Sequence, residues 1–103
     1  MLISEIEGWH YVISWDNPQP ADSSSMRKAL TRLGKLYSLK TKTSVVLAPK
    51  SSTSVHDVRA AIRDNLNAVK GNAFYVNLKS GKGFQISMKH GGVWKSAAGP
   101  KSA

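Results

Sequence analysis

Few side chains in this sequence are of a type, and at a spacing, that suits catalysis or metal binding. The chain has no cysteine, which excludes disulfides, thiolate metal sites and thiol nucleophiles. Its histidines, His10, His56 and His90, lack the spacing of a metal-binding pair, so we expect surface or capping roles for them. The serine-rich stretches lack a nucleophile-elbow sequence, and capping or turn roles account for them. Carboxylates and cations are therefore the groups left to act on a ligand.

The excess of cations is the strongest functional signal. Among 103 residues there are 15 Lys and Arg against 6 Asp and Glu, which gives a net charge of +9. Such an excess attracts polyanions and speeds their capture, and nucleic acid is the commonest partner of a basic domain. An anionic membrane surface, an acidic protein partner or simple solubility are the alternative interpretations.

The basic residues form several clusters rather than one arm. The candidate nucleic-acid-binding residues are Arg27, Lys28, Arg32, Lys40, Lys42, Lys50, Lys79 and Lys82. We expect Lys89 to lie with Lys79 and Lys82 near a hairpin, and Arg59 and Arg63 to form a further pair on a helix. Scattered charge of this kind favours contact with backbone phosphates over sequence reading by a single helix.

Aromatic residues offer a second route to nucleic acid, because bases stack on exposed rings of strands. We expect Tyr11 and Phe74 in the core, where large rings usually lie, and leave Trp9, Trp15 and Trp94 open to either role. No aromatic RNP-type motif is present, so a standard RNA-recognition module is not expected.

Periodicity predicts the elements that must position these residues. We expect strands at residues 10–15, within 37–48, at 73–78 and at 84–88, and helices at about 24–33 and from Ser54 onward. Gly34 suits the position after the first helix, and Gly71 lies in the segment 67–72 that closes the second. Ser54 and Asp57 have the spacing of a capping box.

The order strand, helix, strand, strand, helix, strand predicts an α+β fold. We expect a ferredoxin-like βαββαβ sandwich with an additional C-terminal strand. Residues 1–95 would form one domain and residues 96–103 a mobile tail. The sequence has no secretory signal and no apolar run that could cross a bilayer, so we expect a cytoplasmic protein without membrane contact.

Short strand-like motifs resemble one family. They are Tyr11-Val12-Ile13-Ser14-Trp15-Asp16, Thr43-Ser44-Val45-Val46-Leu47, Ser52-Thr53-Ser54-Val55 and Ala73-Phe74-Tyr75-Val76-Asn77-Leu78. Together they resemble the small CRISPR-associated ferredoxin-like nucleases, and more closely their SinR-like relatives; VapD ribonucleases and the antitoxin endoribonuclease GhoS are similar too.

The resemblance implies a homodimer with Mg²⁺ held between the two copies by an aspartate that ends the first strand, here Asp16. It implies endoribonuclease or DNA cleavage in some members and a DNA-holding role in others. Mg²⁺ prefers hard oxygen ligands, and one carboxylate per chain is a small number of ligands for a metal site. A twofold axis between two copies would supply a second carboxylate. Alternatively, Asp16 caps the loop that follows it, and the protein is a non-catalytic partner such as an antitoxin or a mobile-element accessory factor.

Overall fold

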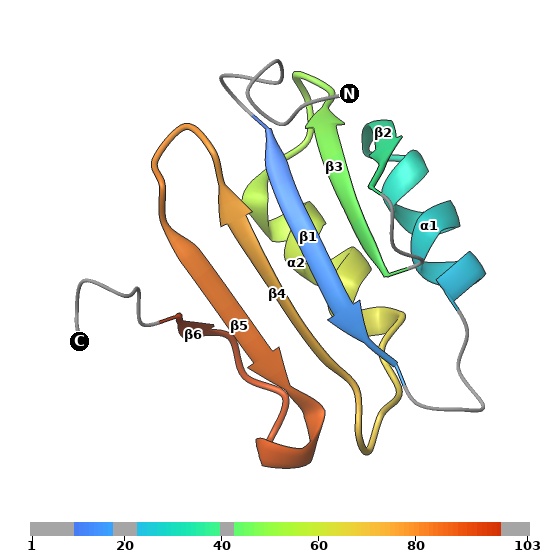
Figure 1. The fold of residues 1–103 in the computed structure, drawn as a ribbon, viewed down its shortest axis with the longest axis vertical. Helices are drawn as coiled ribbons and strands as arrows, with labels where there is room; N and C mark the ends of the chain where they lie inside the picture. Colours follow the sequence, from blue (N-terminus) through green and yellow to red (C-terminus); the bar gives the residue numbers. More distant parts are fainter. Residues whose placement is uncertain (1–9, 18–22, 40–42, 98–103) are drawn as a thin grey trace.

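The computed structural model describes residues 10–17, 23–39 and 43–97 (Figure 1). Its elements are β1 (Tyr11–Asp16), α1 (Ser23–Thr31), β2 (Gly34–Ser38), β3 (Ser44–Pro49), α2 (Val55–Asp64), β4 (Asn72–Asn77), β5 (Gly83–Ser87), the 3₁₀ turn η2 (Met88–His90) and β6 (Lys95–Ser96). The predicted α+β class is confirmed, since the described residues form two α-helices and one six-stranded sheet.

The sheet has the order β2-β3-β1-β4-β5-β6, and every neighbouring pair is antiparallel. β1 lies inside the sheet, where it pairs with β3 on one side and with β4 on the other. Its β-branched and aromatic residues suit a central strand, which has a hydrogen-bonded neighbour on each edge. β5 and β6 extend the sheet beyond β4, and β6 is an additional short strand that periodicity did not predict.

The core lies between the sheet and the two helices; in Figure 1, α2 lies behind β1 and β4, and α1 lies beside β3 and β2. Side chains alternate along β1, so Tyr11, Ile13 and Trp15 face the helices and are buried. Leu30 from α1 and Ile62 from α2 meet them and are fully buried. Burial of each such aliphatic side chain contributes about 1.5–3 kcal/mol, which holds the helices on this face.

The predicted capping box at the start of α2 is confirmed. The backbone N–H of Asp57 donates to Ser54 Oγ at 3.2 Å, and the Ser54 N–H donates to Asp57 Oδ2 at 2.9 Å. The backbone hydrogen bond from Ser54, followed by its hydroxyl, holds the pKa of Asp57 below its ordinary value. The start of α2 is therefore fixed by local chemistry.

The predicted ends of both helices were wrong. α1 ends at Thr31 rather than near Leu33, and Gly34 begins β2 instead of following a helix. A Cβ at Gly34 would lie 2.1 Å from the Ala48 carbonyl oxygen, so close strand contact explains this glycine. α2 ends at Asp64, and the expected closing segment around Gly71 is a loop.

The last predicted strands were displaced by one residue, and one face was assigned wrongly. β4 ends at Asn77 because the Asn77 side chain accepts the N–H of Lys79 at 2.8 Å and starts a turn. β4 pairs Tyr75 with Ile13, which puts Tyr75 among the helices, 0% exposed. Phe74 therefore points the other way and is 43% exposed, so its predicted place in the core was wrong. β5 ends at Ser87, where η2 begins.

Candidate nucleic-acid interface

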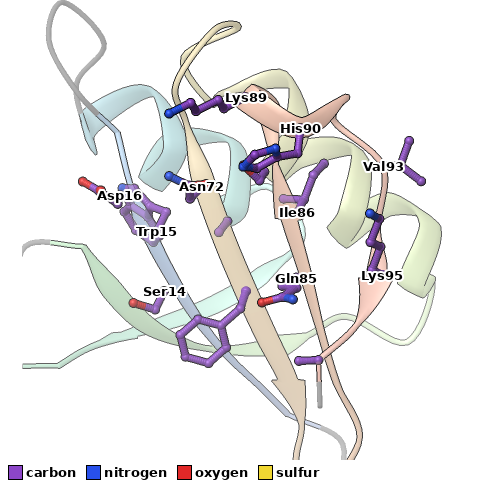
Figure 2. Close-up of a pocket in the computed structure, with 14 residues that line it drawn as sticks. Ser14, Trp15, Asp16, Asn72, Gln85, Ile86, Lys89, His90, Val93 and Lys95 are labelled. Atoms are coloured by element: carbon purple, nitrogen blue, oxygen red, sulfur yellow. The ribbon is translucent and has the colours of Figure 1, made fainter.

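A groove of about 890 Å³ lies on the side of the sheet that the helices leave open (Figure 2). β1, β4 and β5 form its floor, and the segment after β5 forms a wall. The outward side chains that line it are Ser14, Asp16, Asn72, Phe74, Gln85, Lys89, His90, Val93 and Lys95. Cationic, amide and aromatic groups thus meet in one open hollow.

The floor of the groove follows from strand register. Ser14 lies opposite Phe74, Phe74 opposite Gln85, and Gln85 opposite Lys95, so these four residues form one row across β1, β4, β5 and β6. Directly opposed residues of antiparallel strands have Cβ atoms about 4.5–5.5 Å apart. The row therefore carries a hydroxyl, an aromatic ring, an amide and a cation side by side on the surface.

The wall depends on a sharp reversal after η2. Gly91 and Gly92 have positive φ angles of 97° and 64°, which glycine adopts without steric cost. The Gly92 N–H donates to the Ser87 carbonyl at 2.9 Å, and Arg63 Nε donates to the Gly92 carbonyl at 3.0 Å. Half-buried Trp94 then packs against the core, and its neighbours in sequence line the groove.

Asp16 ends β1 as predicted and lies exposed at the rim of the groove, opposite Asn72 in β4. Among the described residues its carboxylate has no hydrogen-bond partner. The loop contacts come from the next residue instead, because Asn17 Nδ2 donates to the Asn65 carbonyl at 2.8 Å. Within the described residues, Asn17 rather than Asp16 ties this strand end to the α2–β4 loop. The prolines that follow lie outside the described residues.

The described residues of one chain do not by themselves form a magnesium centre at Asp16. Within residues 10–17, 23–39 and 43–97, no three His, Cys, Asp or Glu side chains form a group that could hold a metal ion. Magnesium in proteins is held by carboxylates together with water and substrate phosphates. Asp16 thus supplies one carboxylate to any such centre, and other ligands would have to come from elsewhere.

The structure separates the predicted nucleic-acid-binding residues. Arg27, Lys28 and Arg32 belong to α1 or its end, in the helical layer rather than at the groove. Arg27 is half-buried: its guanidinium lies 5.9 Å from the centre of the Trp15 ring, and Nη1 donates to Ser38 Oγ at 3.4 Å. Lys28 and Arg32 are exposed and open to a ligand.

The remaining predicted cations lie outside the groove or outside the described residues. Lys50 is exposed just after β3, and Lys79 and Lys82 are exposed in the turn between β4 and β5. The expected grouping of Lys89 with that turn was wrong, because β5 separates them and Lys89 follows its far end (Figure 1). Lys40 and Lys42 lie outside the described residues.

Arg59 points into an aromatic cluster rather than toward solvent. Its Nε donates to the Tyr75 hydroxyl at 2.7 Å. Its guanidinium lies 4.6 Å from the centre of the Phe84 ring and 5.8 Å from the centres of the Tyr75 and Trp94 rings. Both arginines lie on α2 as expected, but only Arg63 is exposed, and its Nε also donates to the Gly92 carbonyl.

The sequence does contain a signal for the groove residues that were not predicted from it. Lys95 and the exposed Phe74 are placed by strand alternation, once Tyr75 is taken as the inward residue of β4. From the sequence, either Phe74 or Tyr75 could be the aromatic residue of β4 that faces the core. Only the pairing of β4 with β1 determines that Tyr75 faces inward. Of the three tryptophans left open, Trp15 is buried, Trp94 is half-buried, and Trp9 lies outside the described residues.

Comparison with known proteins finds no matching family model, no matching curated protein and no matching solved structure. The resemblance to small ferredoxin-like nucleases therefore depends on the short motifs alone. Among the described residues, no helix has the length and apolar character needed to cross a bilayer.

Proposed function

We propose that this chain is a nucleic-acid-binding protein that contacts backbone phosphates through exposed lysines and arginines. The surface charge of the described residues carries the proposal. Asp16 and Asp64 are exposed carboxylates there, and the exposed cations outnumber them. These cations are Lys28, Arg32, Lys35, Lys50, Arg63, Lys70, Lys79, Lys82, Lys89 and Lys95. A surface of this sign attracts phosphate and releases counterions on binding.

The spread of the charge favours a broad, sequence-tolerant contact. The cations lie on α1, after β3, in the β4–β5 turn and beyond β5, so no single helix carries them. Contacts of this kind position a nucleic acid without reading its bases. A homodimer, which the family resemblance implies, would double the number of phosphate contacts and lengthen the contacted strand.

The proposal includes a ferredoxin-like fold. Support comes from the element order β1-α1-β2-β3-α2-β4, which is that of the split βαβ arrangement. Further support comes from β1, which lies between β3 and β4, and from the two helices that share one face. In this proposal β5 and β6 are an extension of that unit.

Oligonucleotide binding followed by fluorescence anisotropy tests the phosphate contacts. We expect wild-type protein to bind single-stranded RNA and duplex DNA at low salt. The double variant Lys79→Gln/Lys82→Gln should bind both more weakly by a similar factor, because phosphate contacts carry no sequence information. The matched control Lys79→Arg/Lys82→Arg keeps the charge and should keep the affinity. Absence of binding to every nucleic acid at low salt would reject the proposal and favour an acidic protein partner.

A magnesium-dependent endoribonuclease is the second candidate. The observation that favours it is the exposed Asp16 carboxylate at the rim of a groove that also carries Lys89 and His90. The described residues of one chain supply a single carboxylate here, and in this candidate a second Asp16 across a twofold axis supplies another.

Incubation with structured and single-stranded RNA, with Mg²⁺ or with chelator, tests this candidate. Asp16→Asn should abolish Mg²⁺-dependent cleavage and leave the fold intact, since the residue is exposed. Equal cleavage by the variant rejects a role for Asp16. Tight binding without cleavage by wild-type protein identifies a nucleic-acid-holding scaffold instead.

A further inference from the structure

We propose that the groove on the open face of the sheet binds an unpaired nucleotide, whose base stacks on Phe74. The inference rests on the proposed nucleic-acid binding and adds that the groove takes single strands. It names a site that the charge clusters do not identify, because Lys89 lines the groove whereas Lys79 and Lys82, with which it was grouped, do not.

The exposure of Phe74 is the first observation. Its ring is 43% exposed in the middle of a sheet, although three other aromatic side chains nearby, Tyr75, Phe84 and Trp94, pack against one another in or beside the core. Its neighbours in the row are Ser14, a small residue, and Gln85, an exposed amide, so no bulky apolar side chain flanks it there. An exposed aromatic ring on a strand is a platform on which any base can stack.

Amide side chains flank this platform and can bind the edges of a base. Gln85 is exposed and lies directly opposite Phe74 in β5. Asn72 is two residues from Phe74 on the same face of β4, and its Nδ2 donates to the Lys70 carbonyl at 3.2 Å. That bond fixes the Asn72 amide and leaves its oxygen to accept from a ligand. A stacked base would therefore find both donors and acceptors beside the ring.

Cationic side chains lie where we expect the sugar-phosphate backbone of a stacked nucleotide. Lys95 lies in the same row as Phe74, two strands away, at roughly 10 Å between backbones. Lys89 and His90 border the groove near its other end, as Figure 2 shows. All three side chains are exposed, so they can contact phosphate without first breaking a buried interaction. The groove thus pairs an apolar platform with positive charge on its wall.

The shape of the site favours an unpaired nucleotide over a duplex. Bases of a duplex are stacked on each other and present only their edges, whereas a ring platform needs a free base face. The wall formed by η2 and the residues that lead to β6 borders an open hollow of about 890 Å³. Its lining combines apolar side chains with amides and cations, which matches the apolar faces and polar edges of a nucleotide base and its charged phosphate.

The test compares Phe74→Leu, which keeps an apolar side chain, with Phe74→Trp, which keeps a ring. Both are exposed substitutions, and thermal unfolding should show that both variants fold. We expect Phe74→Leu to weaken binding of a single-stranded RNA oligonucleotide about fivefold or more and to leave duplex affinity unchanged. Phe74→Trp should bind single strands as well as wild-type protein, with quenching of its fluorescence by the stacked base. Lys95→Gln should weaken single-strand binding as well.

The outcomes separate this inference from the proposed function. If Phe74→Leu binds single strands like wild-type protein while Lys79→Gln/Lys82→Gln binds them weakly, phosphate contact stands and stacking in the groove is wrong. If Phe74→Leu loses the same factor of affinity for duplex DNA as for single-stranded RNA, the inference is also overturned. If sedimentation shows that Phe74→Leu dissociates an oligomer, the face is a contact between copies and the nucleotide site is rejected. Failure of wild-type protein to bind any nucleic acid rejects the proposed function itself.

Discussion

Arg59→Ala should destabilise the protein far more than loss of an exposed cation would. In the wild-type protein, Arg59 Nε donates to the hydroxyl of Tyr75, a residue that is 0% exposed, at 2.7 Å. A hydrogen bond that involves a charged group contributes about 1.5–3 kcal/mol, and loss of one partner leaves the buried hydroxyl unsatisfied. The stacked Phe84 ring at 4.6 Å adds about 0.5–1 kcal/mol.

The hydrogen bond and the contact with the Phe84 ring involve the same guanidinium, so their contributions do not simply add. We expect Arg59→Ala to lower the free energy of unfolding by about 2–4 kcal/mol. In a domain of this size the melting temperature should fall by roughly 10–30 °C. Urea denaturation followed by tryptophan fluorescence measures the change. Lys70→Ala removes an exposed cation as the matched control and should stay within about 0.5 kcal/mol of wild type.

A double-mutant cycle with Tyr75→Phe isolates the hydrogen bond. Tyr75→Phe keeps the ring and removes only the hydroxyl, so the two single changes should not add. We expect a coupling energy of about 1–2 kcal/mol between Arg59 and the Tyr75 hydroxyl. A coupling near zero, or a loss for Arg59→Ala no larger than for Lys70→Ala, would refute the account of Arg59 as a structural residue.

Further predictions concern single positions. Gly34→Ala should lower the free energy of unfolding by about 1–3 kcal/mol in urea titrations, because its Cβ would lie 2.1 Å from the Ala48 carbonyl oxygen; an unchanged midpoint would contradict that geometry. Ser54→Ala should cost about 0.5–2 kcal/mol through loss of the cap of α2. The lowered pKa of Asp57 means that its charge stabilises the folded state above the ordinary value of 3.8, and this contribution is lost as pH falls through the lower folded pKa. Wild type and Asp57→Asn should thus differ in stability near neutral pH and converge in acid, and a constant difference in pH-dependent denaturation would be evidence against this linkage.

Much of the fold was predictable from local sequence patterns. The capping-box spacing of Ser54 and Asp57 placed the start of α2, and the apolar run of Val45 to Leu47 placed β3, because such signals act within a few residues. The ends of elements were less predictable. Gly34 suits a helix end equally well, and only its contact with Ala48 across the strand pair makes it the start of β2.

The candidate site was less predictable than the fold, since it depends on contacts between distant segments. Asp16 was a candidate because the family resemblance implies an aspartate at the end of the first strand, and the structure confirms that Asp16 ends β1. Phe74 was missed because its face depends on pairing with β1, about sixty residues away in sequence. Arg59 was taken for a surface cation because helical spacing does not reveal the aromatic side chains that β4, β5 and the residue before β6 bring to it.

The salt dependence of nucleic-acid binding tests the central claim most directly. The measurement is the association constant of wild-type protein for a single-stranded oligonucleotide, titrated across monovalent salt concentrations. We predict a linear fall of log K with log salt, with a slope near −0.7 for each phosphate contacted, and a shallower slope for Lys79→Gln/Lys82→Gln. Affinity that does not change with salt, or no binding at low salt, would contradict the claim that exposed lysines and arginines contact the phosphate backbone.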